Sequence, residues 1–463
     1  MTEMTRPAPV PTPGTDPPRS GGSWGLAVNA SDARDPWERL EMAAGHRDWF
    51  AWHDGRRGLS YVAWGAVARF SPRGPDRFAQ VRDWIAPLVD RLPAEAPGLM
   101  GALPLAVGGF SFTPRCAEPG PLWGRWPDGA FIVPETIVAR HPTGTSVTAT
   151  LRPPRGWRVP SATDPQPNRA GPRLTTVESR EHYEQLVTAT VRRIDAGGLE
   201  KAVIARPATI LASDRRRFDP IAVLRALRDG HPRAVCFAMA RGGEVFLGAS
   251  PETLVAMHGG LLATQAVAGT TKADEDEGGA RLRRSAKDEH EHVLVVQSIE
   301  RALGPLCDDL TVGPRRLARA GDVHHIVTGI DATPRTGTTV LDAVAALHPT
   351  AALCGTPRHE AAAWIAEREG FDRGWYGAPI GWLGPDGDGV FAVAIRSALL
   401  SDHVATAFVG AGIVHGSSPA AEWEETEAKL GPVRRALDAG LAVDRTPGTH
   451  AEPTAVSMQG GPP

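Results

Sequence analysis

The chain has 463 residues, of which 42% are hydrophobic and 22% are charged, and its formal net charge at pH 7 is −3. This length and balance indicate a large folded protein with a buried core and give no basic footprint for nucleic acid or anionic lipid. No stretch approaches the roughly 20 apolar residues of a membrane span, and the N-terminus lacks the basic-then-apolar order of a signal peptide, so we expect a cytoplasmic protein.

Pro-rich tails flank the expected folded unit, which spans residues 24–445. Residues 1–23 and 446–463 lack large apolar side chains and are predicted to be disordered, because they cannot offset the entropy lost on ordering. Residues 152–173 are rich in Pro and Arg, which predicts a linker or a long surface loop. The four cysteines form no CxxC pair, which indicates reduced thiols.

The N-terminal third predicts a helix near residues 78–92 and strands at residues 130–138 and 146–151. An amphipathic helix is predicted at residues 179–196, closed by two glycines. Further strands are predicted at residues 201–208, 234–240, 245–249 and 262–267. This order of elements predicts an α+β fold with a large, mainly antiparallel sheet.

A capped helix is predicted after Ser285. Ser285 has the character of an N-cap, Asp288 stands where a capping-box acid stands, and an apolar run follows at residues 293–303. Glu291 then lies near the start of the helix, on a face that also carries apolar side chains. Such a face normally points inward.

A second polar helix is predicted after a serine cap, with Pro419 at its first position. Glu422, Glu425 and Lys429 follow at spacings of three and four, so they share one helix face. A solvated face with a Glu425–Lys429 ion pair accounts for this spacing, and so does a functional site.

Nine short motifs decide between these interpretations. In chain order they are KAVIAR at residues 201–206, FLGASPETLV at 246–255, AVAGT at 266–270, SAKDEHEH at 285–292, VHHIVT at 323–328, HPTAALCG at 348–355, YGAPIGW at 376–382, AIRSA at 394–398, and GAGIV with AEWEET within 410–426. Together they resemble the chorismate-utilising family, which includes isochorismate synthases, salicylate synthases, and the large subunits of anthranilate and aminodeoxychorismate synthase. The resemblance covers about residues 177–437, within a motif-bearing part at residues 174–440.

The resemblance implies a more definite fold than the pattern of elements does. It implies a two-lobed β-sandwich with outer helices, like the large subunit of anthranilate synthase, with the site between the lobes. Relatives without partner subunits are often monomers, so a monomer is expected. No glutaminase motif occurs in the chain, and no glutaminase subunit is expected.

The family's substrate, chorismate, requires an acid and, for water addition, a base. Glu252 follows Pro251 at the end of an apolar strand, where partial burial would raise its pKa and keep it protonated, so it is the candidate acid for the departing C4 hydroxyl. Lys201 is the candidate base for water attack at C2, because ammonia-using relatives typically have glutamine there. It must be neutral to act, which desolvation on a strand favours. A glutamate in a surface turn and a solvated lysine at a strand end are the alternatives.

Two alanines separate the activities within the family. Ala268 stands where relatives with a covalent intermediate have a lysine, and alanine cannot attack. Ala352 stands where lyase-active and aminating relatives usually have threonine, which favours an isochorismate synthase. Salicylate synthase is the first alternative activity, and an enzyme like component I of anthranilate or aminodeoxychorismate synthase is the second. A catalytically silent binding protein is the alternative of another class. The sequence does not separate siderophore, menaquinone and salicylate biosynthesis as the pathway served.

The resemblance also implies a cofactor and a substrate-binding set. Hard oxygen ligands without a nearby thiolate favour Mg²⁺, with Glu291 and Glu425 as direct ligands and Glu422 acting through water. The implied substrate-binding residues are Gly269, Thr270, His325, Thr328, Ala352, Arg396, Gly412 and Lys429. Arg396 and Lys429 would neutralise the side-chain carboxylate of chorismate, and the glycines would let backbone N–H groups approach the substrate. A packed structural histidine is the alternative for His325.

Three positions depart from the family pattern. Ala421 stands where relatives often have glycine, and Cys354 where serine is usual. Gly431 and Pro432 are expected to kink or end the last helix soon after Lys429, which leaves the aim of that lysine open.

Overall fold

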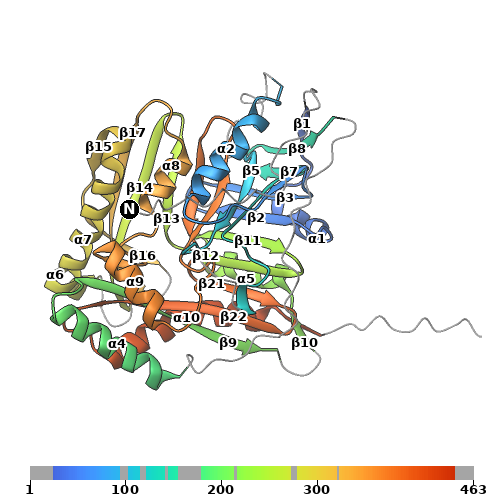
Figure 1. The fold of residues 1–463 in the computed structure, drawn as a ribbon. Helices are drawn as coiled ribbons and strands as arrows, with labels where there is room; N and C mark the ends of the chain where they lie inside the picture. Colours follow the sequence, from blue (N-terminus) through green and yellow to red (C-terminus); the bar gives the residue numbers. More distant parts are fainter. Residues whose placement is uncertain are drawn as a thin grey trace, which may run out of the picture.

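The structure is a computed structural model that describes residues 24–93, 103–114, 121–140, 144–154, 179–212, 216–272, 279–320 and 323–443. The predicted disordered tails and most of the predicted linker at residues 152–173 lie outside these residues. The described residues form two large sheets with helices outside them (Figure 1).

The larger sheet has eleven strands among the described residues. In spatial order they are β1 (Gly25–Ala30), β8 (Ser146–Arg152), β7 (Thr136–Arg140), β3 (Leu59–Trp64), β2 (Trp49–Asp54), β11 (Val235–Arg241), β12 (Glu244–Ser250), β21 (Ser397–Ser401), β22 (Val404–Val414), β9 (Lys201–Leu211) and β18 (Gly355–Thr356). Strands from the N-terminal third therefore continue a sheet that strands of the motif-bearing part complete.

The second sheet has ten strands among the described residues. Along its path lie β15 (Cys307–Val312), β17 (Val323–Pro334), β14 (Leu261–Lys272), β13 (Thr253–His258), β20 (Gly389–Val393), β19 (Pro379–Leu383), β5 (Ala106–Phe110), β6 (Gly129–Val133) and β4 (Ala68–Phe70), while β16 (Arg316–Ala320) also pairs with β17. A small ribbon joins β10 (Arg216–Phe218) to β23 (Leu441–Val443). The strand pairings in both large sheets are antiparallel, as the sequence predicted.

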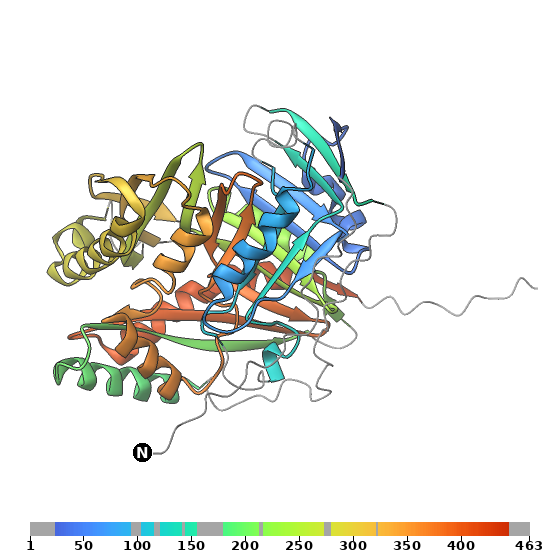
Figure 2. The ribbon, with the colours of Figure 1, turned by 45° about the horizontal axis from the view of Figure 1, so that its top comes forward.

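Helices cover the outer faces of the sheets (Figure 2). The α-helices are α1 (Leu40–Ala44), α2 (Arg77–Val89), α4 (Arg180–Asp195), α5 (Pro220–Gly230), α6 (Ala280–Arg284), α7 (Ala286–Leu303), α8 (Val340–Leu347), α9 (Arg358–Arg368) and α10 (Pro419–Ala439). Short 3-10 turns are η1 (Pro36–Arg39), η2 (Pro121–Trp123) and η5 (Gly304–Leu306). Among the described residues, no helix is long and apolar enough to cross a membrane.

Alternation along the strands divides the core into two layers. On β2, Phe50 and Trp52 belong to one apolar cluster, whereas Ala51 belongs to a second cluster that α5 and α10 cover. This follows from the two-residue period of a strand, which points successive side chains to opposite faces. Across the inner layer, Tyr61 of β3 meets Trp382 of β19 with ring centroids 6.4 Å apart, so the two sheets pack face to face. The α+β class is confirmed.

Two local predictions are corrected. The single strand predicted at residues 130–138 is two strands, β6 and β7, which belong to different sheets. Pro134 lies between them and has no N–H to continue a ladder. Helix α10 does not end soon after Lys429 but continues through Pro432 to Ala439. The buried Leu430 and Val433 pack in the outer core, which offsets the hydrogen bond that Pro432 cannot make.

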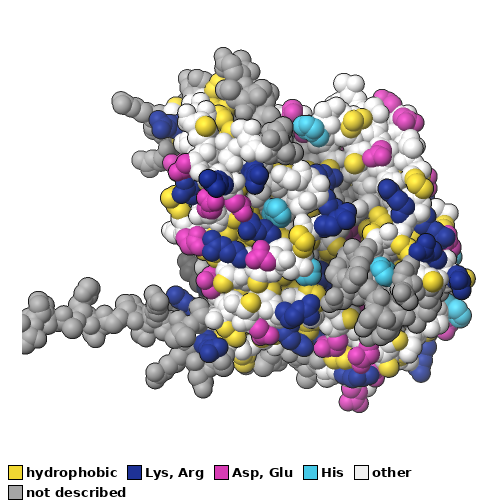
Figure 3. All heavy atoms as spheres, turned by 180° about the vertical axis from the view of Figure 1, so that it is seen from behind, with side chains coloured by type: hydrophobic (Ala, Val, Ile, Leu, Met, Phe, Trp, Pro, Cys, Tyr) yellow, Lys and Arg dark blue, Asp and Glu magenta, His cyan; other side chains and the backbone are white. Residues whose placement is uncertain are grey.

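On the face shown in Figure 3, Lys and Arg side chains are interspersed with Asp and Glu.

Candidate active site

A cavity of about 290 Å³ is lined by residues of both large sheets and of two helices. The larger sheet contributes residues of β9 and β22, the second sheet contributes β14 and β17, and α7 and α10 add charged side chains. The predicted site residues that line it are Lys201, Glu252, Gly269, Glu291, His325, Ala352, Arg396, Gly412, Glu422, Glu425 and Lys429. Residues separated by more than 200 positions in sequence thus meet in one place.

Lys201 begins β9 and is buried in an ion pair. Its Nζ lies 2.7 Å from Glu291 Oε1 on α7, and only 1% of its side chain is exposed. Gly412 on the adjacent strand makes room for this pair, because a Cβ there would lie 3.0 Å from Glu291 Oε1 and 3.1 Å from Lys201 Cε. Lys201 is therefore not the solvated strand-end lysine of the alternative interpretation.

The carboxylate face of α10 forms another wall of the cavity. Glu425 Oε1 lies 2.6 Å from Lys429 Nζ, which also donates to the Gly410 carbonyl oxygen at 3.0 Å. Glu422 is buried one turn earlier. The expected Glu425–Lys429 ion pair is present, but the helix face that carries it is turned to the cavity.

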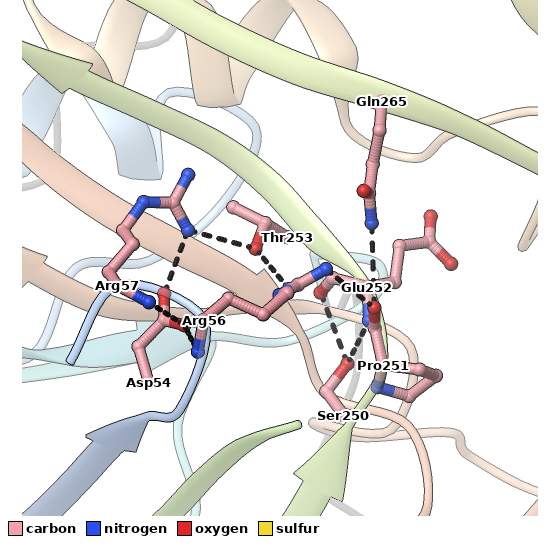
Figure 4. A network of polar contacts seen from close by, with 8 residues as sticks. All are labelled: Asp54, Arg56, Arg57, Ser250, Pro251, Glu252, Thr253 and Gln265. Carbon is pink, nitrogen blue, oxygen red and sulfur yellow. Dashed lines mark hydrogen bonds and ion pairs between the residues drawn. The ribbon is translucent and has the colours of Figure 1, made fainter. Parts of the chain in front are cut away.

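Glu252 lies in the turn between β12 and β13. Ser250 Oγ accepts a hydrogen bond from the Glu252 N–H and donates to the Glu252 carbonyl oxygen, both at 3.1 Å, which fixes the backbone of the turn. The carboxyl group reaches away from the neighbouring arginines (Figure 4) and lines the cavity. Burial raises its pKa to about 7, although Lys201, Arg56 and Lys429 act in the opposite direction. A substantial fraction of Glu252 is thus protonated at neutral pH, as a general acid must be.

Arg396 adopts a backbone conformation that is costly for a residue with a side chain. Its φ is +52°, in the left-handed region, which costs roughly 1–3 kcal/mol and is typical of functional sites. Burial lowers the pKa of its guanidinium, and Tyr376 and Glu425 oppose that change. The strained turn directs a planar, five-donor cation toward the cavity, where it can bind a carboxylate in a fork.

Of the two residues predicted to lie along the substrate ring on β17, the structure brings one to the cavity. His325 lines it, and burial together with nearby Arg396 and Lys429 lowers its pKa to about 3, so the ring is neutral at physiological pH. Thr328 does not line the cavity, because residues three apart on a strand point to opposite faces. Its hydroxyl instead lies 2.8 Å from His292 Nε2 on α7.

The AVAGT strand reaches the cavity at a bulge. The β14–β17 register shifts between Ala268 and Thr270, and Gly269 there has φ +75°. A Cβ at Gly269 would lie 3.0 Å from the Asp288 Cβ, so glycine is needed for both its backbone angle and its space. Thr270 pairs with His325 in the ladder, and its side chain lies outside the described part of the structure.

The oxygen donors fit a hard cation that keeps several waters. Glu291, Glu422 and Glu425 line the same cavity and are accompanied by Asp288, with no cysteine among the lining residues. Among the described residues, no group of three or more His, Cys, Asp and Glu is arranged to hold a metal by itself. Mg²⁺ usually takes only one or two protein carboxylates and completes its shell with water and substrate oxygens, so the donor set suits it.

Sequence reasoning missed three residues of this region. Asp288 was interpreted only as a helix cap, although its spacing of three from Glu291 places both on one helix face. Tyr376 lies in a quoted motif without an assigned role, and burial raises the pKa of its phenol to about 12, so it remains a donor. Arg56 lies almost 200 residues before the turn that it contacts, and no local pattern could have indicated that contact.

Comparison with known proteins decides the family. A sequence model of the family described as chorismate binding enzyme matches residues 23–438. The chain belongs to this family. The match extends to the N-terminal third, where no motif had been recognised.

Relatives in this family resemble the chain over most of their length. The salicylate biosynthesis isochorismate synthase of Pseudomonas aeruginosa is 36% identical over 423 residues, which cover 84% of this chain and 85% of that protein. Isochorismate synthase MenF of Bacillus subtilis is 33% identical over 361 residues, covering 72% and 74%. The solved structure of MenF, the menaquinone-specific isochorismate synthase from Escherichia coli, matches with a TM-score of 0.71 and 25% identity, covering 90% of this chain and 95% of that one.

Proposed function

We propose that the protein is a Mg²⁺-dependent isochorismate synthase, an isomerase that converts chorismate to isochorismate. The observation that carries the proposal is that Lys201 and Glu252, a candidate base and a candidate acid, line one cavity together with carboxylates and cationic groups. The names of the relatives from P. aeruginosa, B. subtilis and E. coli support the same activity.

The reaction exchanges one hydroxyl group for another. A water oxygen bonds to C2 while Lys201 takes its proton, the ring double bonds shift, and the C4–oxygen bond breaks. Glu252 gives its proton to the departing hydroxyl, which leaves as water, so no atoms are gained or lost overall. The raised pKa of Glu252 suits this role, because hydroxide is a poor leaving group without protonation.

Glu291 and Glu425 would hold Mg²⁺, with Glu422 acting through water. When bound, the cation would neutralise and orient the ring carboxylate of the substrate. Both glutamates are paired with lysines in this structure, Glu291 with Lys201 and Glu425 with Lys429. If Glu291 were bound to the cation, it would no longer hold Lys201 in its charged ammonium form through the ion pair. Lys201 must be uncharged to act as a base.

The second carboxylate of chorismate, on the enolpyruvyl side chain, would bind Arg396 and Lys429. Both line the cavity. Arg396 would provide a two-donor fork, and Lys429 a compact charge once it leaves Glu425. His325 and Gly269 would lie beside the ring on the opposite wall.

Ala352 supports isochorismate, and not salicylate, as the released product. It lines the cavity with only a methyl group. Elimination of pyruvate needs the enolpyruvyl arm folded over the ring, and the methyl group of Ala352 offers that arm no hydrogen bond. We expect no glutaminase subunit, because Lys201 stands where ammonia-using relatives have glutamine. We further expect a cytoplasmic monomer.

Product analysis with catalytic variants tests the proposal. The purified protein with chorismate and Mg²⁺ should form isochorismate, detected by chromatography. Lys201→Gln and Glu252→Gln should each reduce the rate by about 10² to 10⁴, because they remove the base and the acid. Near-normal isochorismate formation by Lys201→Gln would show that another group is the base, and salicylate as the main product would reassign the activity.

A further inference from the structure

The turn that carries Glu252, between β12 and β13, contacts a residue that lies outside the motif-bearing part of the chain. The turn that joins β2 to β3 carries Arg56, which reaches the β12–β13 turn almost 200 residues later (Figure 4). Arg56 Nη2 donates to Thr253 Oγ1 at 2.8 Å, and Nη1 donates to the Pro251 carbonyl oxygen at 3.3 Å. These two acceptors flank Glu252 on both sides in sequence, so one guanidinium group spans the backbone that presents the acid.

The hairpin that carries Arg56 is itself fixed by a buried carboxylate. Asp54 is fully buried, and its Oδ1 accepts hydrogen bonds from the Arg56 and Arg57 N–H groups at 3.0 and 3.2 Å. Its Oδ2 lies 2.7 Å from Arg57 Nη1, which also donates to Thr253 Oγ1 at 3.4 Å. A buried carboxylate saturated with donors is costly to disturb, so the hairpin is a rigid support.

We infer that the β2–β3 hairpin is a positioning element for catalysis, and that Arg56 fixes the aim of Glu252 through Thr253 and the Pro251 carbonyl group. The inference rests on the proposed role of Glu252 as the acid. Arg56 does not line the cavity, so it acts through the turn and not on the substrate. Displacement of a catalytic group by about 1 Å can reduce a rate by about 10²-fold, so a contact that holds the Glu252 turn in place can affect the rate strongly.

Arg56 also contributes its charge to the environment of Glu252. The cationic groups that act on Glu252 are Lys201 from β9, Arg56 from the hairpin and Lys429 from α10, and all three lower its pKa against the effect of burial. The other titratable side chains that line the cavity are Asp288, Glu291, His325, Tyr376, Arg396, Glu422 and Glu425. Removal of the Arg56 charge should therefore raise the pKa of Glu252 further.

Three substitutions separate geometry from charge. Arg56→Gln removes both, so kcat should fall about 10-fold or more with KM nearly unchanged, and the alkaline limb of the kcat–pH profile should move to higher pH because Glu252 remains protonated longer. Arg56→Lys keeps the charge but loses the fork, and Thr253→Val removes the shared acceptor while keeping the side-chain shape. Both should lower kcat without moving the limb. Arg82→Gln is the matched control, since Arg82 makes a comparable long-range contact to Asp342 at the surface.

The outcomes distinguish the inference from the proposed function. If Glu252→Gln retains activity, the acid assignment fails and the inference fails with it. If Glu252→Gln is inactive but Arg56→Gln and Thr253→Val keep the kcat and the pH profile of the unmodified enzyme, only the inference is overturned. A lowered melting temperature with unchanged kcat per folded molecule would assign the hairpin a purely structural role and would also overturn it.

Discussion

Replacing the buried acid should make the protein more stable at alkaline pH while it destroys activity. Glu252 is 7% exposed and its pKa is raised to about 7 from a usual value of 4.5. A carboxyl group with a raised pKa in the folded state stabilises the fold fully below its unfolded-state pKa, and this contribution is lost as pH rises through the folded-state pKa. Glu252→Gln has no charge to bury, so the free energy of unfolding of this variant should not fall in this way as pH rises.

The magnitude follows from the displacement of the pKa. A folded-state pKa about 2.5 above the usual value corresponds to at most about 3.4 kcal/mol in the free energy of unfolding. Of this, about 2.5 kcal/mol is lost between pH 5 and pH 8. With an unfolding entropy of about 2.1 cal/mol/K per residue, a chain of 463 residues changes its melting temperature by about 1 °C per kcal/mol. The difference in melting temperature between Glu252→Gln and the unmodified protein should therefore grow by about 2–3 °C from pH 5 to pH 8.

Thermal unfolding of both proteins at several pH values measures this difference. Glu300→Gln is the matched control, because Glu300 lies exposed on α7 and its replacement should produce no comparable pH-dependent difference. A difference for Glu252→Gln that stays constant between pH 5 and pH 8 would refute the reasoning, since Glu252 would then be ionised throughout this range.

Three further predictions concern the metal site, the space around Lys201, and the product. Glu291→Gln and Glu425→Gln should each weaken Mg²⁺ binding in the presence of chorismate, measured by titration calorimetry, because an amide lacks the anionic charge that holds a hard cation; unchanged Mg²⁺ affinity would exclude that glutamate as a ligand. Gly412→Ala should reduce kcat about 10-fold or more by displacing the Lys201–Glu291 pair. The control Gly304→Ala should leave kcat unchanged, because a Cβ at Gly304 meets nothing within 4 Å. Equal kinetics for both variants would contradict this prediction. Ala352→Thr should release a trace of salicylate and pyruvate and slow isochorismate formation, as chromatography would show; a product mixture identical to that of the unmodified protein would remove Ala352 as a determinant.

The helices that carry the carboxylates were predictable because their signals are local. Ser285 accepts a hydrogen bond from the Asp288 N–H, as the capping pattern predicts, and α7 begins at Ala286, directly after this cap. Pro419 begins α10. Spacings of three and four then place Glu422 and Glu425 on one face whatever the tertiary structure is.

Contacts between distant segments were not predictable from local patterns. The Lys201–Glu291 pair joins residues 90 positions apart, and it forms because Gly412 leaves space over β22. The periodicity of either partner contains no information about this third residue. The same holds for the contact of Arg56 with the turn that carries Glu252.

One prediction was wrong because tertiary packing overrode a local rule, and one predicted substrate residue lies outside the cavity lining. Pro432 normally disrupts a helix, but the buried side chains around it keep α10 intact as far as Ala439. Thr328 could have been excluded as a cavity residue beforehand, since it lies three positions from His325 on one strand and so faces the other side. The resemblance identified the motif, and the two-residue period of the strand decides which of its residues face the cavity.

The central claim is that water adds at C2 of chorismate while the C4 hydroxyl departs. Turnover of chorismate in ¹⁸O-labelled water, followed by mass spectrometry of the product, tests it most directly. The account predicts isochorismate that carries one solvent oxygen, formed only with Mg²⁺ and abolished by Lys201→Gln. Unlabelled isochorismate would show that the hydroxyl migrates within the substrate, and the claim would then be wrong.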